Sequence, residues 1–145
     1  MRPKRDIDRL QEEIQELFAD LWQVPRMAGT RHAYRPQVDC FQSGDPPQLT
    51  VVIELPGVDP DDVHLVAAPR ALLVSGERRR TRCDGQVYNR MEIEYGSFHR
   101  EIPLPEDVDC AAAQATYDRG LLTVVLPLAQ RRPPQERVSI EVTTR

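Results

Sequence analysis

The 145-residue chain has few of the residues that build disulfide scaffolds or zinc sites. It contains three cysteines, Cys40, Cys83 and Cys110, and no C-x-x-C pair. An odd number of widely spaced cysteines argues against a disulfide framework and against a zinc site. The cysteine content therefore favours a protein of a reducing compartment.

Long apolar runs are also missing. The N-terminus, Met-Arg-Pro-Lys-Arg-Asp, leads directly into a charged helical pattern without the apolar core of a signal peptide. No later segment approaches the length of a membrane-spanning run. The formal net charge is −4, and the acidic surplus lies in residues 36–130. A domain with a surplus of negative charge is a poor binding surface for nucleic acid or an anionic membrane. We expect a soluble, cytoplasmic protein with neither nucleic acid nor membrane as a partner.

Motifs of catalysis and cofactor binding are absent from the sequence as well. It has no G-x-x-x-x-G-K or G-x-G-x-x-G phosphate loop and no serine in a G-x-S-x-G setting. His32, His64 and His99 are isolated, and no two of them have the spacing of metal ligands. The sequence therefore predicts no catalytic residue, no cofactor and no bound metal. We expect a protein that is not an enzyme.

One amphipathic helix is expected near the N-terminus, where apolar residues recur at steps of three and four. Asp6 can cap this helix and Pro25 ends it. Its apolar face, here called the N-terminal stripe, consists of Ile7, Leu10, Ile14, Leu17, Phe18, Leu21 and Trp22. One interpretation is a helix packed on its own domain. The other is a stripe that binds other subunits or other proteins, and the irregular linker at 26–35 favours it.

From Pro36 onward the periodicity changes to two. In the strongest strand signal, Leu49, Val51, Ile53 and Leu55 share one face, and Pro56-Gly57 stops the strand. Shorter alternating runs follow, separated by turn signals. They lie at 63–65, 72–74, 98–104, 113–117 and 121–126. This pattern predicts an all-β fold, an immunoglobulin-like β-sandwich.

The end of the chain is a polar tether followed by one short alternating strand. Residues 131–137 are charged and proline-rich, which is typical of a flexible C-terminal tail. After the tether, Val138, Ile140 and Val142 alternate with polar residues. A lone strand cannot fold by itself. We expect this strand to lie in a groove, on its own subunit or on another one.

Arg100 is the one charged residue on an otherwise apolar strand face, which it shares with Phe98, Ile102 and Leu104. An unpaired buried charge costs several kcal/mol, so a guanidinium there needs a partner or lies at an interface. Either the side chain reaches water at the strand edge, or it forms an ion pair between subunits. We favour the ion pair.

Two segments resemble signatures of the small heat-shock proteins of bacteria and plants. Residues 88–105, Tyr-Asn-Arg-Met-Glu-Ile-Glu-Tyr-Gly-Ser-Phe-His-Arg-Glu-Ile-Pro-Leu-Pro, are similar to the family's glutamate, glycine, phenylalanine, arginine and Leu-Pro pattern. Residues 115–122 resemble its alanine, spacer and Gly-x-Leu signature, which Leu126-Pro127 follows as usual.

Further matches lie upstream and at the C-terminus. Residues 54–58 and 75–78 resemble the family's Leu-Pro-Gly and Gly-Glu-Arg segments. Val138-Ser139-Ile140 resembles its I/V-x-I/V motif, and Ile140-Glu141-Val142 fits that motif almost as well. One departure is Ile93, which stands where the family usually has arginine after the glutamate.

The resemblance implies an α-crystallin domain at 36–128, an N-terminal helical arm and linker at 1–35, and a C-terminal extension at 129–145. It also implies a homodimer in which each subunit lends a loop strand to its partner. Here the lent strand would lie near Gln86–Met91. Residues Tyr88, Glu92 and Arg100 are then expected at the dimer interface.

The resemblance further implies that the C-terminal motif docks between two strands of a neighbouring dimer, which builds larger homo-oligomers. We place the docking groove near Leu65 and Leu122. The function implied is that of an ATP-independent holdase chaperone of the stress response, which binds unfolding client proteins through the N-terminal stripe. The alternative is a co-chaperone adaptor of the CS-domain type that acts as a monomer or dimer. The C-terminal motif speaks against that alternative.

Overall fold

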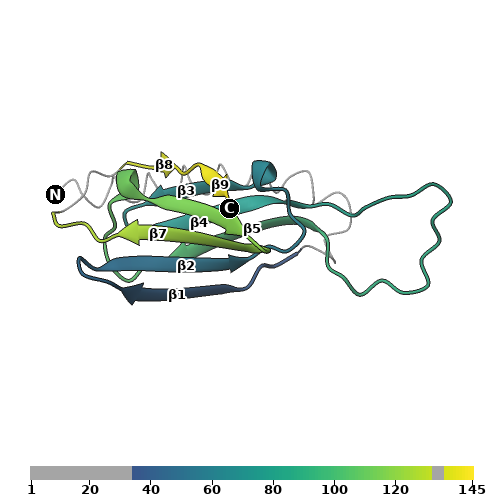
Figure 1. The fold of residues 1–145 in the computed structure, drawn as a ribbon, viewed down its shortest axis with the longest axis horizontal. Coiled ribbons are helices and arrows are strands. Elements are labelled where there is room, and N and C mark those ends of the chain that lie inside the picture. The colour runs from purple at the N-terminus through teal and green to yellow at the C-terminus, as the bar shows by residue number, and fades with distance from the viewer. Residues whose placement is uncertain (1–33, 132–135) are drawn as a thin grey trace, which may run out of the picture.

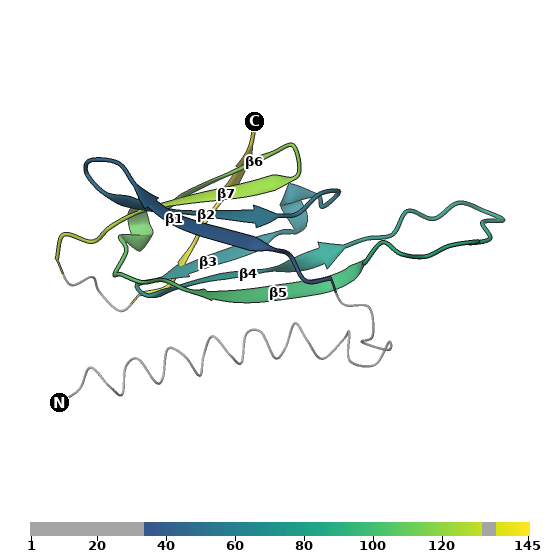
Figure 2. The same ribbon diagram turned by 90° about the horizontal axis from the view of Figure 1, so that it is seen from below.

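The computed structural model describes residues 34–131 and 136–145, which form two facing β-sheets (Figures 1 and 2). The larger sheet has the strand order β1-β2-β7-β6-β9 and the smaller sheet the order β5-β4-β3-β8. The strands are β1 (Val38–Ser43), β2 (Gln48–Glu54), β3 (His64–Ala68), β4 (Ala71–Arg78), β5 (Gly96–Pro103), β6 (Gln114–Asp118), β7 (Leu121–Pro127), β8 (Val138–Ser139) and β9 (Val142–Thr144). Two short 3-10 helices, Pro60–Asp62 and Cys110–Ala112, complete the described secondary structure.

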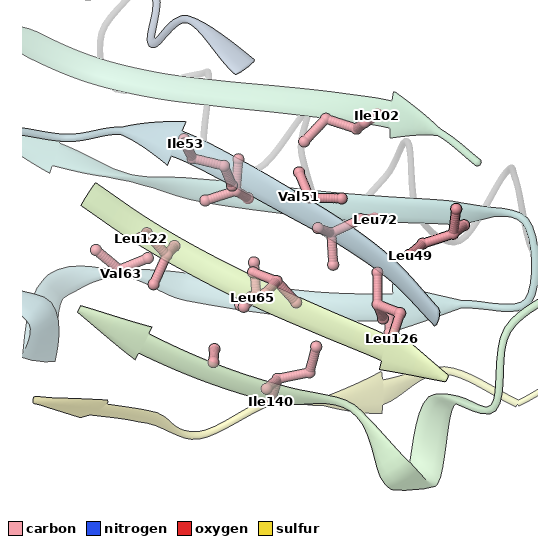
Figure 3. Close-up of a cluster of buried hydrophobic side chains, with 14 of the residues drawn as sticks. Leu49, Val51, Ile53, Val63, Leu65, Leu72, Ile102, Leu122, Leu126 and Ile140 are labelled. Carbon is pink, nitrogen blue, oxygen red and sulfur yellow. The ribbon is translucent and has the colours of Figure 1, made fainter. Parts of the chain in front are cut away.

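The prediction of an all-β sandwich is confirmed. Alternate residues of β2 and β4 point between the sheets, so that Leu49, Val51 and Ile53 share one core with Leu72 (Figure 3). Val74 belongs to the same core cluster. All five of these side chains are buried. Period-two patterning therefore selects the face of each strand that is removed from water. The expected N-terminal helix lies outside the described residues.

Residues 79–95, which connect β4 to β5, form a long loop that extends away from the sandwich (Figures 1 and 2). We call this segment the arm. It contains no strand within the subunit, and this includes the segment Gln86–Met91. A strand needs a partner strand for its backbone hydrogen bonds, and the subunit offers the arm none.

The C-terminal strand expected over 138–142 is two strands in the structure, and this corrects the sequence-based prediction. Strand β8 pairs antiparallel with β3, and β9 pairs parallel with β6. The chain therefore crosses from the smaller sheet to the larger one at Ile140 and Glu141. Strict alternation in the sequence could not reveal this crossing, because the side-chain period remains two on either side of it.

Gly57 and Gly120 offer a matched test of packing at two turns. Both have a left-handed backbone, with φ of +74° and +82°. A Cβ at Gly120 would lie 3.1 Å from the Cα of Pro56, whereas one at Gly57 would meet nothing within 4 Å. We expect Gly57→Ala to lower the free energy of unfolding by about 1–2 kcal/mol. Gly120→Ala should cost roughly 1 kcal/mol more, because the Pro56 backbone must also move. Denaturant unfolding measures both losses, and equal values would contradict the prediction.

Candidate functional site

The C-terminal tail pairs with β3 of the smaller sheet and with β6 of the larger one, and we call the position between these two strands the groove. Its central residue is Ile140, whose side chain is only 9% exposed and joins the core (Figure 3). The backbone N–H of Ile140 donates a hydrogen bond of 2.9 Å to the carbonyl of Leu65. Next to it, Ser139 pairs with Val66 in the β3–β8 ladder. One buried side chain and a short ladder thus hold the tail on β3.

The tail then attaches to β6 of the larger sheet. Val142 pairs with Ala115 there, and the Thr143 hydroxyl donates to the Ala115 carbonyl at 3.1 Å. Val138 and Val142 are half-buried and pack against the core from either side of Ile140. The two readings of the motif, 138–140 and 140–142, therefore share Ile140, and both engage the same groove in this subunit.

The two residues predicted to line the docking groove have different places. Leu65 contributes the carbonyl that receives Ile140, whereas Leu122 is a fully buried core residue of β7. The second wall of the groove is β6, through Ala115 and Tyr117, which the sequence analysis did not assign to the groove. The Tyr117 hydroxyl also donates to the Leu55 carbonyl at 2.7 Å, which fixes that wall to the core.

The arm exposes apolar side chains to solvent. Val87 is 83% exposed, and Met91 and Ile93 are each more than half exposed. Tyr88, a predicted interface residue, is also exposed, and Gln86 donates a hydrogen bond to its hydroxyl at 2.7 Å. Large apolar residues gathered on one projecting segment mark an interaction surface more often than a solvated loop.

The base of the arm is held by alternating arginine and tyrosine side chains. The guanidinium of Arg78 lies 4.7 Å from the ring centre of Tyr34 and 5.3 Å from that of Tyr95. The guanidinium of Arg80 lies 4.4 Å from Tyr95 and 5.2 Å from Tyr88. Cation–π contacts of this kind contribute about 0.5–2 kcal/mol each. The sequence analysis missed this cluster. Its members are up to 61 positions apart in the sequence, and only folding brings them together.

Arg100 and Glu92, the other predicted interface residues, have different surroundings. Arg100 is half-buried on β5, and its Nη1 donates to the carbonyl of the buried Pro36 at 2.8 Å. Among the described residues no carboxylate lies within ion-pair distance of Arg100. Glu92 lies on the arm, 3.5 Å from Arg90, and both side chains are largely exposed. Such an exposed pair contributes little to stability.

Two of the three cysteines are weak nucleophiles, and the described residues lack a metal-binding cluster. Burial, together with the neighbouring Asp109 carboxylate, raises the pKa of the Cys110 thiol to about 11, and burial also raises the pKa of Cys40. Both thiols therefore remain protonated near neutral pH and are weak nucleophiles. In residues 34–131 and 136–145, no three histidine, cysteine or acidic side chains cluster as metal ligands would. No helix there is long and apolar enough to cross a membrane.

The chain is similar in sequence to proteins of one known family. The model of the Hsp20/alpha crystallin family matches residues 43–143. The chain is 35% identical over 137 residues to the alpha-crystallin of Mycobacterium tuberculosis. The aligned region covers 90% of this chain and 88% of that protein.

Two solved structures are similar in both fold and sequence. Heat shock protein 16.0 from Schizosaccharomyces pombe has a TM-score of 0.61 and 30% identity, covering 72% of this chain and 96% of that one. A small heat-shock protein from Xylella fastidiosa, described as having a distinct high order structure, has a TM-score of 0.56 and 31% identity, covering 71% and 94%. The chain therefore belongs to the Hsp20/alpha crystallin family, the small heat-shock proteins, which are chaperones rather than enzymes.

Proposed function

We propose that the protein is an ATP-independent holdase, which binds unfolding client proteins in the cytoplasm and prevents their aggregation as a large, dynamic homo-oligomer of dimers. The tail carries this proposal. It consists of two short strands, β8 and β9, after a polar tether, and between them lies the single buried side chain of Ile140. An attachment of this size is weak alone, and many such attachments acting together hold an assembly that still exchanges subunits.

The arm and strand β1 support a dimer in which each subunit completes the sheet of the other. Strand β1 is the edge of the larger sheet, with Phe41 half exposed on it. An edge strand presents unpaired backbone groups that can receive a strand from another chain. The arm has the complementary property, since Val87 and Tyr88 are exposed on a segment without a partner strand. Pairing of residues 86–91 with β1 of the second subunit would bury both.

Arg100 and Glu92 are assigned to the same interface. The guanidinium of Arg100 has one carbonyl partner in its own subunit, at Pro36. A half-buried cation favours a carboxylate partner, because burial makes an unpaired charge unfavourable. The arm of the second subunit carries Glu92, whose side chain is largely exposed before assembly. We assign Arg100 an ion pair across the dimer.

The larger oligomer follows from exchange of the tail between grooves. Residues 128–137 connect β7 to β8 and can span up to ~30 Å when extended. The contacts between Ile140 and Leu65 are the same whether the groove belongs to the same subunit or to a neighbour. Docking on a neighbour therefore differs from the intramolecular arrangement mainly in the entropy of the tether. The same groove would bind either the tail of its own subunit or the tail of a neighbouring subunit.

Client binding is assigned to the N-terminal stripe, which lies outside the described residues. Its residues form an amphipathic helix face in the sequence, and unfolding proteins expose apolar segments that such a face can bind. The tether at 131–137 is polar, and the exposed apolar residues of the arm are assigned to the dimer interface.

The decisive measurement is light scattering by a heat-labile client protein with and without the chaperone, each in the presence and absence of ATP. We expect the chaperone to suppress aggregation equally in both conditions, because the sequence contains no phosphate-binding loop. An absolute requirement for ATP would overturn the proposal. A protein that remains a monomer or single dimer and suppresses nothing would instead fit an adaptor of the CS-domain type.

A further inference from the structure

The arm leaves the sandwich at the point where the backbone ladder between β4 and β5 stops. The last pair of that ladder is Arg78 with Gly96, and the residues between them, 79–95, contain no strand. Side chains take over at this point. Cation–π contacts link five of them in the order Tyr34, Arg78, Tyr95, Arg80 and Tyr88, and we call these residues the arginine–tyrosine cluster. The cluster extends from the sandwich into the arm, whose projection Figures 1 and 2 show.

Tyr34 anchors the inner end of the cluster to both sheets. Its hydroxyl donates a hydrogen bond of 2.6 Å to the carbonyl of Glu54, the last residue of β2. Its ring packs edge-on against the buried Phe98 of β5, with ring centres 6.0 Å apart. The Nε of Arg78 is buried without a hydrogen-bond partner among the described residues. The rings on which this guanidinium lies therefore supply much of its stabilisation.

The outer end of the cluster is fixed within the arm. The hydroxyl of Tyr88 accepts a hydrogen bond of 2.7 Å from the side-chain amide of Gln86. The side-chain carbonyl of Gln86 accepts a second one, of 2.9 Å, from the backbone N–H of Cys83. The turn at the tip of the arm is thus tied to Tyr88. Through Arg80 and Tyr95 it is then connected to the sandwich.

Arg80 is the member that joins the two parts of the cluster. Its guanidinium contacts both Tyr95, next to β5, and Tyr88, in the segment 86–91. Arginine suits this position because its flat guanidinium stacks on aromatic rings and keeps its charge at any physiological pH. Arg82 lies two residues further along the arm, is exposed, and makes no such ring contact within the described part of the chain. The chain therefore offers a matched control for Arg80.

We propose that the arginine–tyrosine cluster holds the arm of the free subunit in the direction from which residues 86–91 pair with another subunit, and that Arg80 is its positioning residue. A segment that is ordered in advance loses less conformational entropy on binding. If only a fraction of the free subunits has the competent arrangement, the apparent affinity falls by that fraction. The consequence for the dimer rests on the dimer proposed above, whereas the ordering of the arm does not.

The direction of the arm can be measured as a distance between two spin labels in the full-length protein. One label is attached to Cys83, which is exposed near the tip of the arm. The other is attached to Thr116→Cys, at an exposed position of β6. Cys40→Ser removes the other exposed thiol, and the buried Cys110 remains unlabelled. Labelled protein is refolded with an excess of unlabelled protein, so that the distances recorded lie within one subunit.

This measurement uses the background Val87→Asp with Met91→Asp, in which we expect no pairing of the arm with a second subunit. We expect one narrow distance distribution, which Arg80→Gln and Tyr95→Leu should lose. Tyr95→Phe keeps the ring, and Arg82→Gln leaves the cluster complete, so both should retain the narrow distribution. Thermal melts should agree among all four, because the core is unchanged. A narrow distribution in Arg80→Gln and Tyr95→Leu would overturn the proposal, and so would a broad one when the cluster is intact.

The consequence for the dimer is measured in the background Val138→Ser with Ile140→Ser, in which the tail is not expected to join dimers. We expect Arg80→Gln to raise the dissociation constant of the dimer roughly tenfold, because two cation–π contacts that order the arm are lost. Tyr95→Phe and Arg82→Gln should leave it unchanged. Sedimentation velocity over a series of concentrations gives this constant.

An unchanged dissociation constant in Arg80→Gln, together with a broadened distance distribution, would overturn the role of the cluster in dimerisation. Absence of any dimer in the same background would instead contradict the proposed dimer. The spin-label distances would then still decide whether the cluster orders the arm. Failure of this inference and failure of the proposed function are therefore distinguishable.

Discussion

Replacing Val138 and Ile140 together with serine is expected to reduce large assemblies to dimers. Burial of the two side chains contributes roughly 3–6 kcal/mol per tail before the cost of ordering the tether. A net of about 4 kcal/mol corresponds to a millimolar affinity, so the assembly depends on the sum over many tails. The proposed dimer uses the arm, which is a different surface, and should survive. Native mass spectrometry gives the subunit number of the variant.

Exchange of exposed residues in the same tail provides the control. Glu141→Ser with Thr144→Ser changes two exposed positions of the same segment and leaves Ile140 in place. This control should retain the full-size particle. Far-UV circular dichroism should report unchanged β-sheet for both variants, because the core strands β2, β4 and β7 do not depend on the tail. Full-size particles in the Val138/Ile140 variant would contradict the prediction and would show that assembly depends on Val142 or on the N-terminal helix.

Placing aspartate at Val87 and Met91 is expected to convert dimers to monomers. Both side chains are exposed in the single subunit, so the change removes no contact of its own fold. In the proposed dimer they would lie against β1 of the second subunit, where a charge would be desolvated and unpaired. Light-scattering mass measurements at micromolar concentration report the expected fall to the monomer mass.

Thr81→Asp with Arg82→Gln changes the net charge of the same arm by the same amount, at exposed polar positions outside the segment 86–91. Since these side chains tolerate water, this pair should remain dimeric. Dimers that persist in the Val87/Met91 variant would show that subunits join through another edge. The Val87/Met91 variant should still unfold cooperatively, because the arm extends away from the core (Figure 1).

Much of the fold follows from local pattern. The alternation of Leu49, Val51 and Ile53 identified both a strand and its buried face, because side chains of a strand point alternately to its two sides. The apolar strand face interrupted by Arg100 led to the expectation of a partner for this cation, and the ion pair between subunits stays a prediction. The structure supplies the Pro36 carbonyl, a hydrogen-bond acceptor that lies 64 positions earlier in the chain.

Contacts between distant segments could not be predicted from local alternation. The arginine–tyrosine cluster at the base of the arm joins Tyr34, Arg78 and Tyr95, and no periodicity links those positions. The second wall of the groove was likewise missed, because the parallel pairing of β9 with β6 depends on how two sheets meet. Patterns of one segment contain no information on which other segment will lie beside it.

The amino-acid pattern thus established the class of fold, the polar tether and the apolar residues of the tail, since burial preference and strand period are local properties of a chain. The folded arrangement established that the tail crosses between the sheets at Ile140 and that β6 forms the second wall of its groove. Both facts arise where surfaces from separate segments meet. Their free energy comes from water excluded between those surfaces, and this quantity exists only once the sheets are packed.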